Sequence, residues 1–241
     1  MSLFADLGMR YPIIQAPMAG VQNTELAMAV TGAGALGSLP AAMLSTAELR
    51  KALEQLAASG PGPFNINFFC HRQSEPDPAE EQRWREALAP YYAEFGVDAR
   101  AVTTAPGRAP FNAEHAAMLG EFRPAVVSFH FGLPAPELLA RVKATGASVF
   151  ASATTVAEAQ WLARHGADAI IAQGLEAGGH RGHFLNQDLS LQQGTFTLLP
   201  QIVAAVDLPV IAAGGIVDGK GIKAALALGA SAVQMGTAFL C

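Results

Sequence analysis

Two histidines stand in sequence contexts that favour chemistry over packing. His180 lies in the segment EAGGHRG (176–182), where the glycines on both sides leave it nothing to pack against. An imidazole changes its charge near neutral pH, so a histidine there suits a general base or a donor that holds an anion. The alternative is a solvated loop histidine. His130 lies in SFHFG (128–132), and an isolated histidine beside aromatic residues is as readily a core residue as a substrate ligand.

Two glycine turns follow apolar runs near the end of the chain. They are AGGI, with Gly214 and Gly215, and QMGT, which runs from Gln234 to Thr237. Glycine allows backbone N–H groups to approach an anion closely, so the two turns together favour a phosphate site. The alternative is a pair of tight turns that bind no ligand.

Further candidates lie after other apolar runs. Asn67 is a polar residue inside FNINFF (64–69), so it is either structural or a ligand donor. The segment QAPMAG (15–20) offers apolar contact to a flat ring, or is an ordinary packed turn. Arg181 suits a phosphate or a loop carboxylate. Cys70 has no partner at a spacing that would make it a nucleophile, so we interpret it as structural.

The apolar pattern predicts the elements that must position these residues. The runs are near-continuous rather than alternating, as in parallel strands buried on both faces. Helical stretches lie between them; Thr46 and Thr155 stand at expected N-caps, and Gly60 and Gly166 at expected C-terminal ends. The pattern indicates an α/β fold, a (β/α)₈ TIM barrel, with a doubly wound sheet as the alternative. The eight runs are 12–16, 35–39, 64–69, 125–131, 148–151, 169–173, 209–213 and 232–235.

Three segments depart from a plain barrel, although we expect residues 1–241 to form one domain. Residues 71–124 contain Pro76, Pro78 and a charged stretch, which predicts a helical insertion, with a short β-like piece at 101–103. Residues 177–195 form a Gly-rich loop of the length typical of binding loops and lids. No helix follows the eighth run, so we expect a barrel truncated after strand eight, with its C-terminal closing helices missing.

Composition excludes several classes of protein. Hydrophobic residues make up 51% of the chain and charged residues 15%, with a mean hydropathy of +0.28, so a disordered protein is excluded. No apolar stretch approaches the roughly 20 residues of a membrane helix. A net charge of −5 does not favour nucleic acid. Two cysteines make neither a disulfide framework nor a metal cluster, which fits a reducing cytoplasm. There is no dinucleotide motif, P-loop or metal-ligand spacing.

The motifs taken together resemble a known family over essentially the whole chain. The chain resembles the nitronate monooxygenases, formerly called 2-nitropropane dioxygenases, and within them the class I type. The resemblance is specific because it rests on several motifs at once. The segments that carry it are 15–20, 64–69, 128–132, 173–182, 212–216 and 234–240.

The resemblance implies a flavoprotein in which FMN lies over the barrel mouth. Its implications for single residues are that His180 is the active-site histidine and that His130 is a second candidate for holding the substrate. The lack of metal-ligand spacing predicts that no metal is bound. The residues implied to bind FMN are Ala16, Pro17, Met18, Asn67, Gln173, Gly178, Gly179, Gly214, Gly215, Gln234, Met235, Gly236 and Thr237.

The implied reaction is oxidative denitrification of an alkyl nitronate such as propionate 3-nitronate. The nitronate gives an electron to oxidised flavin, O₂ is consumed, nitrite leaves and a carbonyl compound remains. His180 orients the nitronate and acts as a base only toward a neutral nitroalkane. FMN-dependent enoyl-acyl-carrier-protein reductases carry a similar EAGGH segment and are the alternative. A third possibility is a flavin-binding barrel without activity, or a cofactor-free isomerase that uses only the phosphate site.

Overall fold

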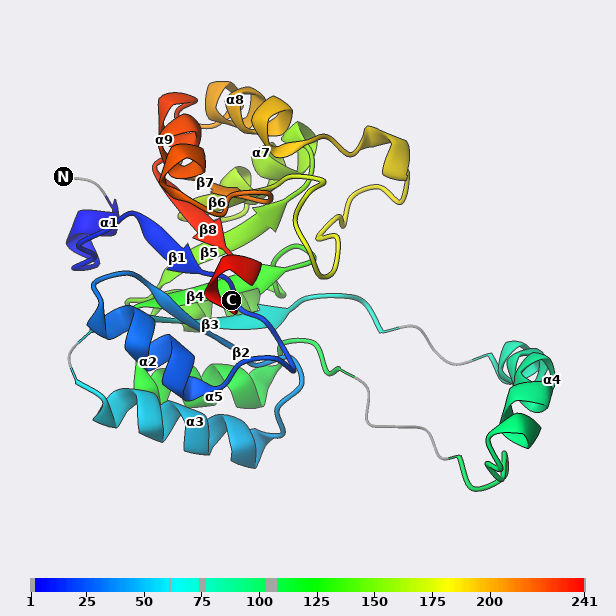
Figure 1. The fold of residues 1–241 in the computed structure, drawn as a ribbon. Helices are drawn as coiled ribbons and strands as arrows, with labels where there is room; N and C mark the ends of the chain where they lie inside the picture. The colour runs from blue at the N-terminus through cyan, green and yellow to red at the C-terminus, as the bar shows by residue number, and fades with distance from the viewer. Residues whose placement is uncertain (1–2, 61, 74–76, 103–107, 241) are drawn as a thin grey trace.

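Eight parallel strands form a barrel, which confirms the predicted fold (Figure 1). The computed structural model describes residues 3–60, 62–73, 77–102 and 108–240. The strand order around the sheet is β1-β8-β7-β6-β5-β4-β3-β2, so each strand lies beside its neighbours in sequence. The strands are β1 Ile13–Gln15, β2 Gly37–Pro40, β3 Phe64–Phe69, β4 Val126–His130, β5 Ser148–Ala153, β6 Ala169–Gln173, β7 Val210–Ala213 and β8 Ala232–Met235.

The barrel closes between β1 and β2, where pairing is sparsest. A single parallel bridge joins Ile14 to Leu36. Two backbone hydrogen bonds accompany it: the Gln15 N–H donates to Leu36 O at 2.9 Å, and the Leu36 N–H donates to Ile13 O at 3.0 Å. The fully buried Gln15 side chain adds a third link, since its Oε1 accepts the Ser38 N–H at 2.9 Å. A polar side chain therefore supplements the ladder at this position.

Most of the helices cover the outside of the barrel, and several begin at side-chain caps. Thr155 caps α7 by accepting the Glu158 N–H, as predicted. The prediction that Thr46 caps α3 is wrong, because Ser45 is the N-cap and forms a capping box with Glu48. The helices are α1 Leu3–Asp6, α2 Thr24–Gly32, α3 Thr46–Ala58, α4 Pro78–Glu94, α5 Ala113–Phe122, α6 Pro136–Lys143, α7 Val156–Arg164, α8 Thr195–Ala205 and α9 Gly219–Ala227.

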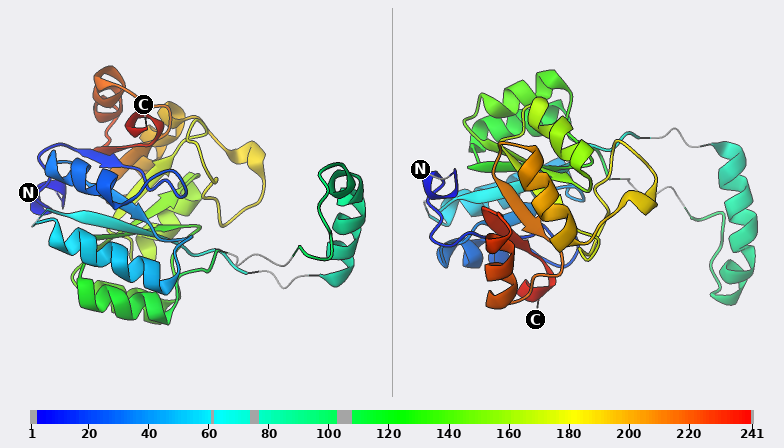
Figure 2. Two further views of the ribbon diagram at one scale, coloured as in Figure 1. Left: turned by 60° about the horizontal axis from the view of Figure 1, so that its bottom comes forward. Right: turned by 90° about the horizontal axis from the view of Figure 1, so that it is seen from above.

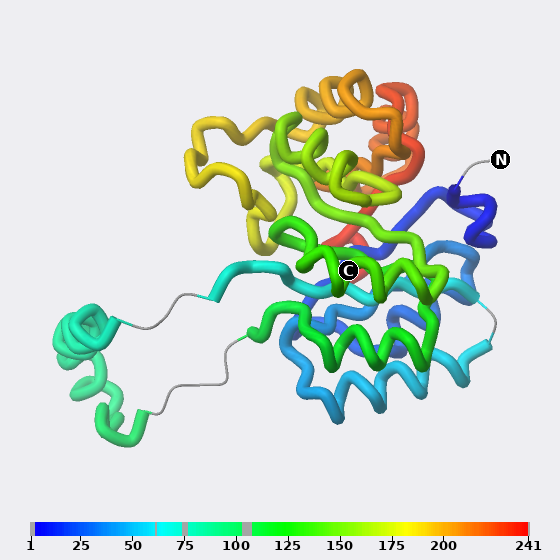
Figure 3. The backbone as a smooth tube through the Cα atoms, turned by 180° about the vertical axis from the view of Figure 1, so that it is seen from behind, coloured from blue at the N-terminus to red at the C-terminus, as the bar shows by residue number. Residues whose placement is uncertain are grey.

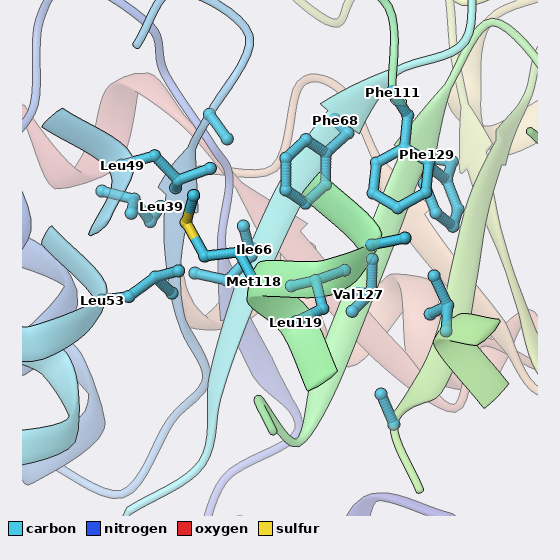
Figure 4. Packing of buried hydrophobic residues seen from close by; sticks show 14 of the residues in the cluster. Leu39, Leu49, Leu53, Ile66, Phe68, Phe111, Met118, Leu119, Val127 and Phe129 are labelled. Carbon is cyan, nitrogen blue, oxygen red and sulfur yellow. The ribbon is translucent and has the colours of Figure 1, made fainter. Parts of the chain in front are cut away.

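Side chains alternate between two apolar layers along each strand. Outward-facing residues such as Ile66 and Phe68 of β3 pack against α3 and α5, where Leu53 and Leu119 are fully buried (Figure 4). Inward-facing apolar residues of the other strands, such as Ile171 of β6, fill the barrel interior. The alternation decides which side chains at the strand ends can reach the mouth.

The long connection between β3 and β4 carries two helices with different surroundings. Helix α5 packs on the barrel, whereas α4 stands apart from it in every view and buries none of its side chains (Figures 2 and 3). Residues 101–102 form no strand, while residue 103 and Pro76 lie outside the described residues. No described helix is long and apolar enough to cross a membrane.

Candidate active site

A cavity of about 590 Å³ opens at the carboxyl ends of the strands. Its volume falls in the range typical of small-molecule and cofactor sites. The loop between β6 and α8 leaves the barrel at this same end, as does the described segment that follows β3 (Figures 1 and 2). The predicted site residues that line the cavity are Ala16, Pro17, Met18, Asn67, His130, Gln173, Gly178, Gly179, His180, Gly214, Gly215, Gln234, Gly236 and Thr237.

Met235 is the one predicted site residue that does not line the cavity in the described structure. It is 7% exposed and packs in the outer layer with Val233. Its neighbour Gln234 points to the interior, because successive side chains of a strand face opposite sides. The Met235 backbone contacts the residue after β1, because its carbonyl accepts the Ala16 N–H at 2.7 Å.

His130 is a positioning group rather than a base. Its Nε2 lies 3.0 Å from the His180 carbonyl, which can only accept, so Nε2 carries the proton. Its Nδ1 lies 3.0 Å from Ser152 Oγ and therefore accepts the hydroxyl proton. Burial lowers the pKa of His130 from 6.5 to about 4, so the ring is neutral at pH 7. The neutral ring fixes the backbone of His180.

This pKa makes the stability of the fold depend on pH. The folded value lies below the unfolded one, so the unfolded chain takes up the proton first as the pH falls. The His130 contribution is present above about pH 6.5 and is lost as the pH falls toward 4. We expect the urea midpoint to fall less between pH 7 and pH 5 in His130→Asn than in the wild type. The exposed His165→Asn variant is the control; a wild-type pH dependence in His130→Asn contradicts the assignment.

The His180 ring stands at the edge of the cavity against two phenylalanine rings. Its centroid lies 5.5 Å from that of Phe69 and 6.0 Å from that of Phe131. Phe131 has a φ of +67°, a left-handed conformation that costs energy for a bulky residue and is typical of functional sites. The turn after β4 is therefore strained where it places a ring against His180.

An arginine that the sequence analysis did not single out contacts His180. Nη1 of Arg108 lies 3.0 Å from Nε2 of His180. A guanidinium only donates, so Nε2 accepts and the neutral ring carries its proton on Nδ1. Both side chains are exposed and both line the cavity. The mouth thus combines an imidazole with a fixed positive charge.

The backbone from His180 to Gly182 is held by Gln173 at the end of β6. Gln173 Nε2 donates to the His180 carbonyl at 2.9 Å, and its Oε1 accepts the Gly182 N–H at 2.7 Å. A Cβ on Gly182 would lie 2.6 Å from the His130 ring, so the close approach requires glycine. Much of the Gln173 amide is therefore used to position the loop.

Arg181 pairs with no loop carboxylate among the described residues. Its guanidinium donates to the carbonyl oxygens of Gln173 and Gly174, and its Nη2 donates to Gln192 Oε1 at 2.6 Å. Gln192 in turn donates to Thr154 Oγ1 at 3.0 Å. Arg181 therefore ties the two halves of the loop to the ends of β5 and β6.

A buried carboxylate on α7 completes this support. Glu158 is 1% exposed. Its Oε2 accepts the Thr154 N–H and hydroxyl, both at 2.8 Å, and its Oε1 accepts the N–H groups of Phe184 at 2.7 Å and Leu185 at 3.3 Å. Four donors satisfy one carboxylate, which stabilises it without a cation in direct contact. Glu158 fixes the loop just after His180.

Several features of the cavity fit a bound FMN. Gln234 Oε1 is buried and has no hydrogen-bond partner in the described structure, although it lines the cavity, so a ligand donor would satisfy it. A Cβ on Gly178 or Gly179 would meet nothing within 4 Å, which leaves room for a ligand against this backbone. Gly214 and Gly215 have φ values of +122° and +67° at the end of β7. These residues suit the phosphate and polar ring edge of a flavin.

Gly178 allows a clean test of this fit. Its backbone conformation is not left-handed and the space around it is open, so Gly178→Val leaves the protein's own packing intact. We expect FMN affinity to fall about tenfold or more, since the side chain fills the cavity. Flavin fluorescence titration measures it. Gly32→Val, at an equally open position outside the cavity, is the control. Unchanged affinity in Gly178→Val places the flavin elsewhere.

Neither a Cys70 thiolate nor a metal site is available for chemistry among the described residues. Burial raises the pKa of the Cys70 thiol well above its usual range, so Cys70 is not a thiolate nucleophile. Among the residues that the structure describes, no group of three His, Cys, Asp or Glu side chains is placed to hold a metal ion.

Comparison with known proteins finds relatives in the family that the sequence motifs resemble. A protein named nitronate monooxygenase from Paraburkholderia phytofirmans is 47% identical over 99% of this chain and 66% of its own length. Another of that name from Pseudomonas aeruginosa is 45% identical over 97% of this chain and 67% of its own length. The chain thus spans about two thirds of the length of these relatives.

Solved structures agree with the sequence relatives. Nitroalkane oxidase from Streptomyces ansochromogenes superposes with a TM-score of 0.87 at 39% identity, covering 99% of this chain and 68% of that one. FabK from Thermotoga maritima reaches 0.72 at 31% identity, covering 100% of this chain and 62% of that one. A family model described as nitronate monooxygenase matches residues 2–241. The chain therefore belongs to the nitronate monooxygenase family.

Proposed function

We propose that residues 1–241 form one FMN-binding barrel domain of an oxidoreductase that converts alkyl nitronates, of the propionate 3-nitronate type, into a carbonyl compound and nitrite with O₂. The observation that carries the proposal is the position of His180, beside a cation, at the edge of a cavity that fits a flavin. Family membership and the similarity to a nitroalkane oxidase support it.

Different residues at the mouth would bind the phosphate and the ring of FMN. The glycine turns after β7 and β8 would hold the phosphate through backbone N–H groups. Ala16, Pro17 and Met18 would contact the flat ring, and Asn67 and Gln234 would bond to its polar edge. Bound FMN supplies the electron acceptor and the reaction with O₂.

The remaining residues would prepare the substrate. A nitronate is already a carbanion-like anion, so it needs orientation and desolvation rather than a base. His180 would donate from its ring to the nitronate. A neutral nitroalkane must first lose a proton, and there Nε2 would accept it in place of the Arg108 hydrogen bond. His130, held neutral, would keep the His180 backbone in place.

Aerobic turnover of propionate 3-nitronate, with nitrite measured, tests the proposal. We expect a yellow protein that releases nitrite and consumes O₂ without a nicotinamide. Anaerobic oxidation of NADH without nitrite release would favour the enoyl-acyl-carrier-protein reductase alternative, for which the FabK similarity is the weaker of the two structural matches. A colourless protein that cannot be loaded with FMN would support the cofactor-free alternative. A cytoplasmic location, inferred from cysteine usage, is part of the proposal.

A further inference from the structure

Arg108 is a cation without a countercharge. No carboxylate lies within ion-pair distance of it among the described residues, whereas Arg50 pairs with Glu121 and Arg100 with Asp98. It is also the one lysine or arginine among the described residues that line the cavity. An unpaired guanidinium at the mouth of a pocket is a binding site for an anion.

The groups around Arg108 do not use all of the N–H donors of its guanidinium. Its hydrogen bond is to His180 Nε2, an uncharged acceptor, and a guanidinium offers five donors. The carboxylate that lines the cavity, Glu176, is occupied elsewhere, since it accepts the Thr195 N–H at 2.7 Å and the Thr195 hydroxyl at 2.8 Å. A carboxylate of a ligand would gain a charge-assisted, two-point contact that His180 does not provide.

The barrel topology separates Arg108 from the proposed phosphate site. The Phe111 N–H donates to Phe69 O at 2.8 Å, so the segment from Arg108 to Phe111 runs beside the end of β3. In the strand order, β3 and β7 are separated by three strands in either direction, and so they lie on opposite sides of the mouth. The glycine turn after β7 therefore faces Arg108 across the cavity, with His180 on the loop between them.

We infer that Arg108 is a specificity-determining residue that binds a carboxylate carried by the substrate. While His180 holds the nitronate, Arg108 holds the second anionic group a few bonds away, and it selects short carboxylate-bearing nitronates over uncharged ones. The inference rests on the proposed function and adds to it the group that distinguishes between substrates.

Steady-state kinetics with two substrates of equal chain length test the inference. Propionate 3-nitronate carries the carboxylate and propyl-1-nitronate lacks it. In Arg108→Met we expect the KM for propionate 3-nitronate to rise about 10- to 100-fold, the range of a lost charged hydrogen bond, and the ratio of kcat/KM for the two substrates to fall by the same factor. Arg108→Lys keeps the charge but loses the planar fork, so its ratio should lie between the two.

The controls separate this role from others. Arg83→Met removes an exposed arginine on α4, and its ratio should equal that of the wild type. An equal loss on both substrates in Arg108→Met overturns the inference, because Arg108 then acts through His180 or the nitronate group. Loss of FMN from Arg108→Met also overturns it, because Arg108 then belongs to the cofactor site.

Calorimetric binding distinguishes failure of the inference from failure of the proposed function. We expect the wild-type holoprotein to bind 3-nitropropionate more tightly than 1-nitropropane, and Arg108→Met to abolish the difference. If that binding pattern appears but neither nitronate is oxidised, Arg108 recognises carboxylates and the proposed function is wrong. If the wild type binds both compounds equally, the inference is wrong whatever the turnover.

Discussion

His180→Ala is expected to retain FMN and to lose most of its activity. The loss should be largest for neutral nitroalkanes, about 10²- to 10⁴-fold, because these substrates need a base to remove a proton. Nitronates, which arrive deprotonated, should lose less, since only orientation by the ring is removed. The ring contacts Phe69, Phe131 and Arg108 but none of the proposed phosphate-binding turns, so flavin content should not change. Nitrite release from each substrate at matched flavin occupancy measures the effect.

His183→Ala is the matched control for this prediction. His183 lies on the same loop and bonds to Gln187, but it does not line the cavity in the described structure. Its removal should leave nitrite release within about twofold of the wild type, as for most surface changes. Equal activity of His180→Ala and the wild type on both substrate types would show that His180 is an ordinary loop histidine.

Glu158→Gln is expected to destabilise the fold and to loosen the loop that carries His180. Two carboxylate oxygens accept four donors here, and an amide offers a single acceptor oxygen, so at least two of these donors lose their partner. Each buried donor left unpaired costs about 1–3 kcal/mol, so the free energy of unfolding should fall by about 2–5 kcal/mol. Urea denaturation measures it.

Hydrogen exchange locates the effect of Glu158→Gln. The amide nitrogen of glutamine replaces one of the two oxygens, so either the Phe184 and Leu185 amides or the Thr154 amide should exchange faster in the variant. Glu137→Gln, an exposed change in the first turn of α6, should alter neither stability nor exchange. Unchanged protection at both Phe184 and Thr154 would show that the loop holds its conformation without Glu158.

The strands could be predicted from the sequence because burial on both faces leaves a direct signal. The bounds expected for β3, β6 and β8 match the structure, since each is an apolar run that ends in a polar or glycine turn. The cap of α3 was misplaced by one residue, because Ser45 and Thr46 are both good N-caps and only the reciprocal bond with Glu48 selects Ser45. The N-cap propensities of serine and threonine alone do not distinguish between the two residues.

The residues of the candidate site could be predicted only where they belong to a distinctive sequence motif. His180 and the glycine turns have distinctive neighbours, whereas Arg108 has none, and only the packing of the β3–β4 connection brings it to His180. Met235 was assigned with its neighbours as one block, and strand alternation turns its side chain away from the cavity. Arg181 has a charge that suggests an anion, yet its partners are carbonyl and amide oxygens that the sequence does not reveal.

The sparse β1–β2 junction affects how this protein resists aggregation. A closed barrel has no free strand edges, whereas an open sheet has two, and free edges pair with other chains. The Gln15 side chain accepts the Ser38 N–H at this junction and also donates to Gln22 Oε1 at 2.6 Å, so one side chain links β1 to β2 and to the loop that follows β1. Losing Gln15 would leave β1 and β2 joined by their two backbone bonds alone. The buried Gln15 amide therefore helps to protect both strand edges from intermolecular pairing.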